Sequence, residues 1–214
     1  MTTVRIWFTK TGEASYISLL DLQRVMGRSL KRSRLPVWYT LGFNPHIYMT
    51  FSCPLPLGQE SLVESVDVKT EAEAPDFDAW RTALNGVMPT GIEVVRVEPV
   101  KMKATEIALA RYTVHCEGEE AAKALDAYNA LDEAFVEKKS KRGLKTVDLK
   151  SLVPRIDHHT EDGDTVFELQ LPAGEAFNLN PALLMTFIQE HCGLTAHPHI
   201  LRTALLTKNM KEFC

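Results

Sequence analysis

Four cationic residues share one side of a helix that the sequence predicts in the first quarter of the chain. The helix is expected to begin at Ser18, to bury an apolar stripe that starts at Leu22, and to end before Pro36. Spacings of i, i+4, i+7 and i+8 place the cations opposite the stripe: Arg24, Arg28, Lys31 and Arg32. Guanidinium forks fit phosphate and carboxylate oxygens, so this side predicts an anionic ligand such as an RNA backbone. A solvated helix face with a local Asp21–Arg24 pair is the alternative.

A rigid bend is predicted at residues 41–46, which read LGFNPH. Gly42 opens backbone conformations that are closed to other residues, and Pro45 forces the residue before it into an extended conformation. Asn44 can hold such a bend by bonding nearby amides, and His46 would emerge beside the next strand, where it can donate, accept or shuttle a proton. The candidate ligand-binding residues of the bend are Gly42, Phe43, Asn44 and His46, and the candidate catalytic residues of the chain are His46 and Asp21. A structural turn with an ordinary histidine is the alternative.

Other histidines and cysteines follow no spacing that fixes the geometry of a metal site. They are His158, His159, His191, Cys192, His197 and His199. We therefore expect neither a metal nor a cofactor, and we expect these histidines in loops and at strand ends. Residues 138–145 (KKSKRGLK) are basic and could touch phosphates, but a solvated loop explains them better.

Charge is distributed unevenly in this chain of 214 residues, whose net charge is −4. Residues 1–52 contain seven Lys and Arg against two Asp and Glu, whereas residues 53–100 contain three against nine. This asymmetry predicts a localised surface that faces an anion, or two adjoining surfaces of opposite charge within the protein.

The four cysteines are widely spaced and form no CxxC pair, so we expect reduced thiols and no iron–sulfur cluster. No run of about 18 uncharged apolar residues is present, and residues 1–7 lack the layout of a secretory signal. We therefore expect a cytoplasmic protein with no membrane partner.

The elements that would position these residues follow one order twice. Val4, Ile6 and Phe8 predict a strand with one buried face. It is followed by the helix from Ser18, extended pieces in 37–52, a strand at 62–68, a helix at 77–87 and a strand at 92–97. The second half predicts strands at 112–116, 134–138, 165–171 and 200–206, with helices at 119–131 and 180–193. The sequence therefore predicts an α+β fold of two tandem ferredoxin-like (β-α-β-β-α-β) units, residues 1–103 and 104–214.

Several segments together resemble the radical-SAM-linked proteins of unknown function. They are residues 16–24 (YISLLDLQR), 42–46 (GFNPH) and 54–58 (PLPLG), followed by Glu64 and Asp67, and the similarity continues through 147–153 and 200–204. The resemblance implies a partner, a radical SAM enzyme with a cobalamin-binding region, to which such domains are often fused or adjacent. Leu19 departs from the family's usual histidine, so any role of that histidine is lost and a binding role is favoured over catalysis.

The predicted pair of units is also similar to the CRISPR repeat-processing ribonucleases, which makes RNA a candidate ligand. We thus expect an accessory protein that binds RNA, with tRNA as one candidate, or another anionic ligand, for a radical SAM partner. The expected ligand-binding residues are Ser18, Asp21, Arg24, Arg28, Lys31, Arg32, Gly42, Phe43, Asn44, His46 and Arg202. Two alternatives stay open: an enzyme that processes or modifies RNA with His46, and a module that docks on the partner through residues 16–67 without nucleic acid.

Overall fold

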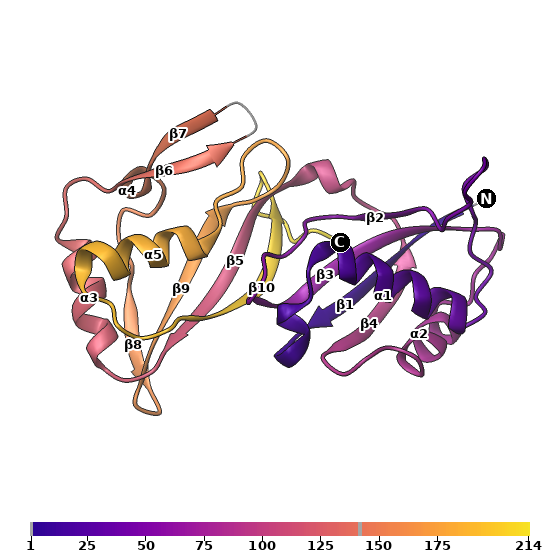
Figure 1. The fold of residues 1–214 in the computed structure, drawn as a ribbon, viewed down its shortest axis with the longest axis horizontal. Coiled ribbons are helices and arrows are strands. Elements are labelled where there is room, and N and C mark those ends of the chain that lie inside the picture. Colours follow the sequence, from indigo (N-terminus) through magenta and orange to yellow (C-terminus); the bar gives the residue numbers. More distant parts are fainter. Residues whose placement is uncertain (1, 141–142) are drawn as a thin grey trace.

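The computed structural model describes residues 2–140 and 143–214. In this part of the chain, five α-helices accompany a mixed eight-stranded sheet (Figure 1). The fold is therefore α+β, as predicted. None of the helices in the described ranges is long and apolar enough to cross a lipid bilayer.

The first half contains four strands and two helices that follow the predicted order. They are β1 (Thr2–Lys10), α1 (Leu19–Arg32), β2 (Met49–Phe51), β3 (Glu60–Thr70), α2 (Phe77–Asn85) and β4 (Ile92–Pro99), with a short 3-10 helix η1 (Gly12–Tyr16). The strands lie in the order β4-β1-β3-β2, and each neighbouring pair is antiparallel. Both helices pack on one face, where Leu22 and Trp80 join Ile6 and Phe8 in a buried cluster.

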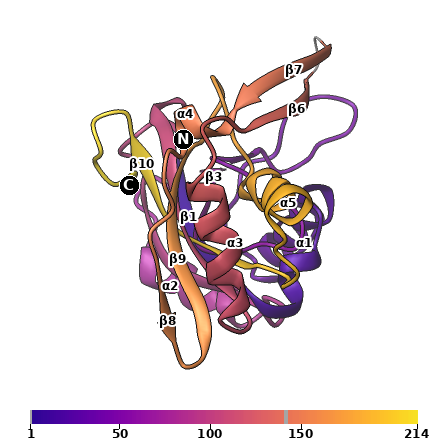
Figure 2. The same ribbon diagram turned by 90° about the vertical axis from the view of Figure 1, so that its left-hand side faces the viewer.

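The second half has the corresponding strand order in the main sheet, and a hairpin and a short helix are added outside it. Its elements are β5 (Ile107–Cys116), α3 (Glu120–Asn129), β6 (Phe135–Ser140), β7 (Gly143–Asp148), α4 (Leu149–Leu152), β8 (His158–Glu161), β9 (Asp164–Pro172), α5 (Pro181–Cys192) and β10 (His199–Thr207). The main-sheet strands lie in the order β10-β5-β9-β8, all antiparallel. Helices α3 and α5 cover one face of these strands (Figure 2).

The strand predicted at 134–138 does not belong to the main sheet. It forms β6, which pairs only with β7 in a separate hairpin that stands apart from the main sheet (Figure 1). The position in the main sheet that was expected for residues 134–138 is occupied by β8. This strand was not predicted because its four residues, HHTE, have no apolar alternation. Residues 141 and 142 of the basic stretch 138–145 lie outside the described residues.

The two halves share one continuous sheet because β3 and β10 pair in parallel. Leu201 pairs with Glu60 and Arg202 with Ser61, while the other end of the same edge of β3 pairs with β2. Division of the chain into domains 1–103 and 104–214 therefore stays a prediction, with the short 3-10 helix η2 (Ala104–Glu106) at the proposed boundary.

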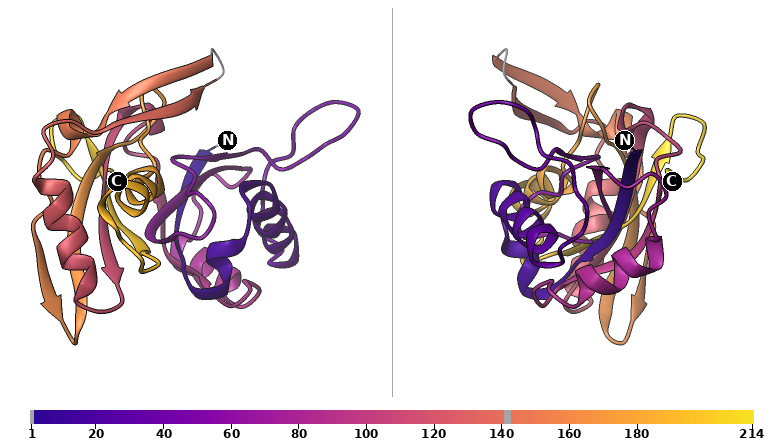
Figure 3. Two further views of the ribbon diagram at one scale, coloured as in Figure 1. Left: turned by 60° about the vertical axis from the view of Figure 1, so that its left-hand side comes forward. Right: turned by 90° about the vertical axis from the view of Figure 1, so that its right-hand side faces the viewer.

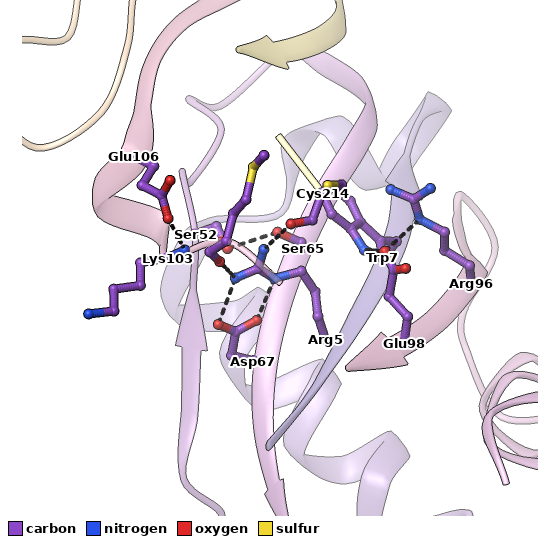
Figure 4. Close-up of polar contacts among 11 residues, drawn as sticks. Arg5, Trp7, Ser52, Ser65, Asp67, Arg96, Glu98, Lys103, Glu106 and Cys214 are labelled. Carbon is purple, nitrogen blue, oxygen red and sulfur yellow. Dashed lines mark hydrogen bonds and ion pairs between the residues drawn. The ribbon is translucent and has the colours of Figure 1, made fainter. Parts of the chain in front are cut away.

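Strand β1 is buried on both faces, whereas the sequence predicted one buried face. The buried Arg5 donates to both carboxylate oxygens of Asp67 at 2.7 and 2.9 Å (Figure 4). It also donates to the backbone oxygens of Met102 at 2.8 Å and Cys214 at 3.2 Å, and its guanidinium lies 4.4 Å from the centroid of the Phe213 ring. The segment before η2 and the segment after β10 are thereby tied to the face opposite the helices.

Helix caps match the sequence signals. The Ser18 side chain accepts a hydrogen bond from the Asp21 amide at 3.1 Å, and α1 ends at Arg32, before Pro36. At α5 the Asn180 side chain accepts from the Ala182 amide at 3.0 Å. Gly193 ends α5 with a φ of 78°, a left-handed conformation that glycine adopts without strain.

Candidate nucleic-acid interface

The outer side of α1 carries all four predicted cations in exposed positions. Arg24, Arg28, Lys31 and Arg32 are exposed, while Leu22, Met26 and Leu30 of the opposite stripe are buried. The amphipathic pattern of the sequence therefore positions the cations as predicted.

Asp21 and Arg24 form a local pair near the start of α1. Arg24 donates to one carboxylate oxygen of Asp21 at 2.9 Å, and the Ser18 hydroxyl donates to the other at 2.7 Å. These hydrogen bonds, first from Ser18 and then from Arg24, lower the pKa of Asp21. An aspartate that is held ionised in this way is a weak proton acceptor, which argues against Asp21 as a catalytic base.

Arg28, Lys31 and Arg32 differ from Arg24 because they form no ion pair with a carboxylate in the described ranges. Arg28 and Arg32 line a shallow depression of about 340 Å³ together with Val87 and Met88, which follow α2. Free guanidinium groups beside an open depression can accept an anionic guest.

The predicted bend is the tip of a loop that closes on itself. The Thr40 amide donates to the backbone oxygen of His46 at 2.8 Å, and the His46 amide donates to the Thr40 hydroxyl at 3.1 Å. Nδ1 of His46 lies 3.0 Å from the same hydroxyl and 3.2 Å from the backbone oxygen of Asn44. In the described part of the chain the Asn44 side chain makes no hydrogen bond, so Thr40 and His46 hold the bend rather than the predicted asparagine.

Two large apolar residues lie bare at the end of this loop. Leu41 is 91% exposed and Phe43 is 102% exposed. Between α1 and β2 the chain, coloured purple, extends away from the rest of the fold (Figure 3). We call Leu41 and Phe43 the loop tip.

The base of the loop lies near the end of α1 and the end of β3, where two separate groups each combine a lysine with one or two aromatic rings. Nζ of Lys31 lies 6.0 Å from the centroid of the Tyr39 ring. Nζ of Lys69 lies 5.1 Å from the Trp38 ring and 4.5 Å from the Tyr48 ring, and these two rings meet edge to face at 6.4 Å. We call these five residues, Lys31, Trp38, Tyr39, Tyr48 and Lys69, the edge surface.

Four members of the edge surface were missed by sequence reasoning. The run Trp38–Tyr39 and the later Tyr48 are visible in the sequence as aromatic residues on both sides of the bend. What places Lys69 beside them is the pairing of Trp38 with β3, through the Trp38 amide and the Lys69 carbonyl at 2.9 Å. This register cannot be read from spacing alone.

Arg202, predicted to contribute from the last strand, does not join this surface. It is 1% exposed, pairs with the buried Glu64 and donates to the backbone oxygen of Cys53 at 2.7 Å. Burial acts to lower the pKa of Arg202, but the charge of Glu64, together with Cys53 and Tyr112, raises it overall. The guanidinium is therefore charged and is fully used inside the protein, where β3 and β10 meet.

Lys10 belongs to the same buried junction. It is 1% exposed and donates to the backbone oxygen of Ser15 at 3.0 Å. Burial lowers the pKa of Lys10, and the nearby Glu64 offsets part of this effect. The negative charge of Glu64 thus stabilises two buried cations of the junction, Arg202 through an ion pair and Lys10 through its nearby charge.

The histidines considered for a metal do not all converge, although His197 and His199 line one depression with His115. Nε2 of His158 lies 3.1 Å from an Asp126 oxygen, and Nε2 of His199 lies 3.3 Å from a Glu60 oxygen. In residues 2–140 and 143–214, no three His, Cys, Asp or Glu side chains are placed to hold a metal ion.

Comparison with known proteins identifies a family. None of the curated proteins matches the chain. A crystal structure of an unknown protein from Galdieria sulphuraria has 12% sequence identity, with 94% of this chain and 98% of that chain covered and a TM-score of 0.28. The family model described as uncharacterized protein conserved in bacteria (DUF2344) matches residues 3–181. The chain therefore belongs to the DUF2344 family of uncharacterised bacterial proteins.

Proposed function

We propose that this protein binds RNA through the edge surface and the exposed cations of α1. The observation that carries the proposal is the presence of two groups at the loop base in which lysines lie 4.5 to 6.0 Å from aromatic rings. Proteins that bind single-stranded nucleic acid combine cations for the phosphates with aromatic rings on which bases stack. Both kinds of group occur here on one edge of the sheet.

Three cations of α1 support the same proposal. Arg28, Lys31 and Arg32 are exposed and form no ion pair in the described ranges. Cations kept free in an acidic protein of net charge −4 create a local positive potential that attracts a polyanion. Lys31 extends this positive surface from α1 to the loop base.

Aromatic contacts also favour binding by ordering the lysines in advance. A lysine over an aromatic ring is attracted by the negative face of the ring, which restricts its rotamers. Lys69 contacts two rings, Trp38 and Tyr48, so it loses less conformational freedom when a phosphate arrives. A freely solvated lysine lacks this advantage.

The strand orders of the two halves, β4-β1-β3-β2 and β10-β5-β9-β8, support the finer description of the fold as two tandem ferredoxin-like units. In this proposal the units span 1–103 and 104–214, with β6, β7 and α4 inserted in the second. RNA as the ligand is compatible with this arrangement, which is similar to that of the CRISPR repeat-processing ribonucleases.

A radical SAM enzyme is the proposed partner, and the cytoplasm is the proposed location. This part rests on the resemblance of residues 16–24, 42–46 and 54–58 to the radical-SAM-linked proteins. In the proposed role the protein presents a bound RNA, with tRNA as one candidate, to that enzyme. Binding is favoured over catalysis because Ser18 and Arg24 hold Asp21 in its ionised form, and because Leu19 stands where the resembled family usually has a histidine.

Filter binding with labelled bulk bacterial tRNA tests the proposal. Arg28→Glu with Arg32→Glu should weaken retention at least tenfold and reduce the slope of log K against log salt by about 1.4, since each lost contact with single-stranded RNA removes about 0.7. The matched control, Lys123→Glu with Arg155→Glu, makes the same charge change on exposed residues of the second half.

The control should stay within about threefold of wild type, because only the general charge has changed. Equal losses in the two double variants would contradict the proposal, as would a wild-type protein that retains no tRNA at moderate salt.

A further inference from the structure

The loop tip, Leu41 and Phe43, is not explained by the fold. We propose that it wedges against unpaired bases, so that the ligand is an RNA with an unpaired loop, bulge or end rather than an uninterrupted duplex. This inference rests on the proposed RNA binding and specifies its ligand class.

Exposure at the tip points to a partner. Phe43 at 102% and Leu41 at 91% are more exposed than any other large hydrophobic residue in the described ranges. Contact of these two apolar side chains with water is unfavourable, and packing against an apolar surface removes that contact. The flat face of a nucleobase is such a surface, and phenylalanine and leucine are among the side chains that insert between bases.

The loop holds the tip in a defined position. Two hydrogen bonds between Thr40 and His46 close its base, and the Tyr39–Ile47 bridge continues the closure toward the sheet. Gly42 has a φ of 131°, a conformation that residues with side chains rarely adopt, although a Cβ there would meet no atom within 4 Å. Glycine is therefore required by the backbone path that projects Phe43, not by crowding.

The charges beneath the tip favour RNA over a protein. Residues 37–48 contain no Asp, Glu, Lys or Arg, and the charged groups that contact the aromatic rings at the loop base are Lys31 and Lys69. A phosphate backbone crossing these lysines would direct bases toward Trp38, Tyr39, Tyr48 and the tip. Charge at the base thus matches a polyanion, while the uncharged tip matches its bases.

Unpaired bases are specified by the geometry of RNA. Bases inside an A-form duplex are stacked on both faces and offer only their edges, so an aromatic ring cannot stack on them. Splayed bases in a loop or bulge expose a free face. A tip that projects beyond the protein surface can reach such a base while the lysines at its foot remain on the backbone.

Two labelled RNAs with the same number of phosphates provide the test: a hairpin with an eight-nucleotide loop and a blunt, fully paired duplex. Wild type should prefer the hairpin at least tenfold. Phe43→Ala should weaken hairpin binding about tenfold, within the range known for loss of one base–aromatic stack, and leave duplex binding and the salt slope unchanged. Phe43→Trp should restore the affinity for the hairpin.

Leu144→Ala is the matched control because Leu144 is an exposed apolar residue, at 61%, on the separate hairpin of β6 and β7. It should bind both RNAs as wild type does. Equal affinities of wild type for hairpin and duplex would overturn the inference.

Unchanged hairpin binding by Phe43→Ala would also overturn it. If Arg28→Glu with Arg32→Glu still weakened binding in that case, RNA binding would stand and the tip would be assigned to a protein partner. If wild type bound neither RNA, the proposed function itself would fail.

Discussion

The buried junction between the two halves predicts a large and unequal loss of stability when either partner of its ion pair is removed. Arg202 is 1% exposed and Glu64 is 2% exposed, so neither charge can be rehydrated in place. Breaking a buried pair by removing one partner typically costs about 3–5 kcal/mol, because the remaining charge is left uncompensated.

The two single variants should differ because Lys10 is also buried at this junction. Arg202→Leu leaves Glu64 with Lys10 as a remaining cation, and we expect a cost of about 3 kcal/mol. Glu64→Leu leaves two buried cations without an anion, and an arginine cannot shed its proton, so we expect about 5 kcal/mol.

The double variant should cost less than the sum of the two single variants by more than about 2 kcal/mol, since it removes both members of the pair. Urea unfolding followed by circular dichroism measures each cost, and thermal melts should fall by about 6–20 °C for the single variants. Arg155→Leu, which removes an exposed pair with Asp157, is the control and should cost less than about 1 kcal/mol. Additive costs, or single variants as stable as the control, would refute the reasoning.

Three further predictions concern stability. Burial raises the pKa of the Cys116 thiol from 9.0 to about 11, so between these pH values the unfolded chain binds fewer protons than the folded chain. The free energy of unfolding should therefore fall by about 1–3 kcal/mol from pH 9 to pH 11. Cys116→Ala should flatten this pH dependence in urea titrations. Asn180→Ala should cost about 1–3 kcal/mol in the same assay, because it removes the N-cap of α5 and the side-chain oxygen that accepts a hydrogen bond from the Gln59 amide at 2.6 Å. A loss below about 0.5 kcal/mol would contradict this prediction. Gly91→Ala should cost at least about 2 kcal/mol more stability than Gly118→Ala in thermal melts. Both glycines have a positive φ, but only at Gly91 would a Cβ lie 2.4 Å from a backbone oxygen. Equal melting temperatures of the two variants would contradict this prediction.

Local sequence signals predicted most of the elements because capping and periodicity are local effects. Both ends of α1 were predicted from local residues, the cap at Ser18 and the proline at position 36. The spacing of the cations predicted which side of the helix is exposed. Asn180, Pro181 and Gly193 gave both ends of α5. These residues act on backbone groups within a few positions, so no tertiary information was needed.

Long-range register accounts for what the sequence could not predict. Strand β8 lies at the edge of the sheet, where half-exposed and exposed residues are tolerated and alternation disappears. Arg202 reads as a candidate ligand because arginines are mostly exposed, yet β10 is central and brings it to Glu64, 138 residues away along the chain. Lys69 reaches Trp38 and Tyr48 only through pairing along β3.

Ultraviolet crosslinking of the protein to bulk tRNA, followed by trypsin digestion and mass spectrometry, tests the central claim most directly. Residues 35–69 contain no Lys or Arg before the last position, so one tryptic peptide carries all three edge-surface aromatics and the loop tip. We predict that crosslinked nucleotides are found mainly on this peptide, and that Phe43→Ala reduces them. Crosslinks confined to peptides of residues 107–207 would contradict the claim that RNA binds at this edge of the sheet.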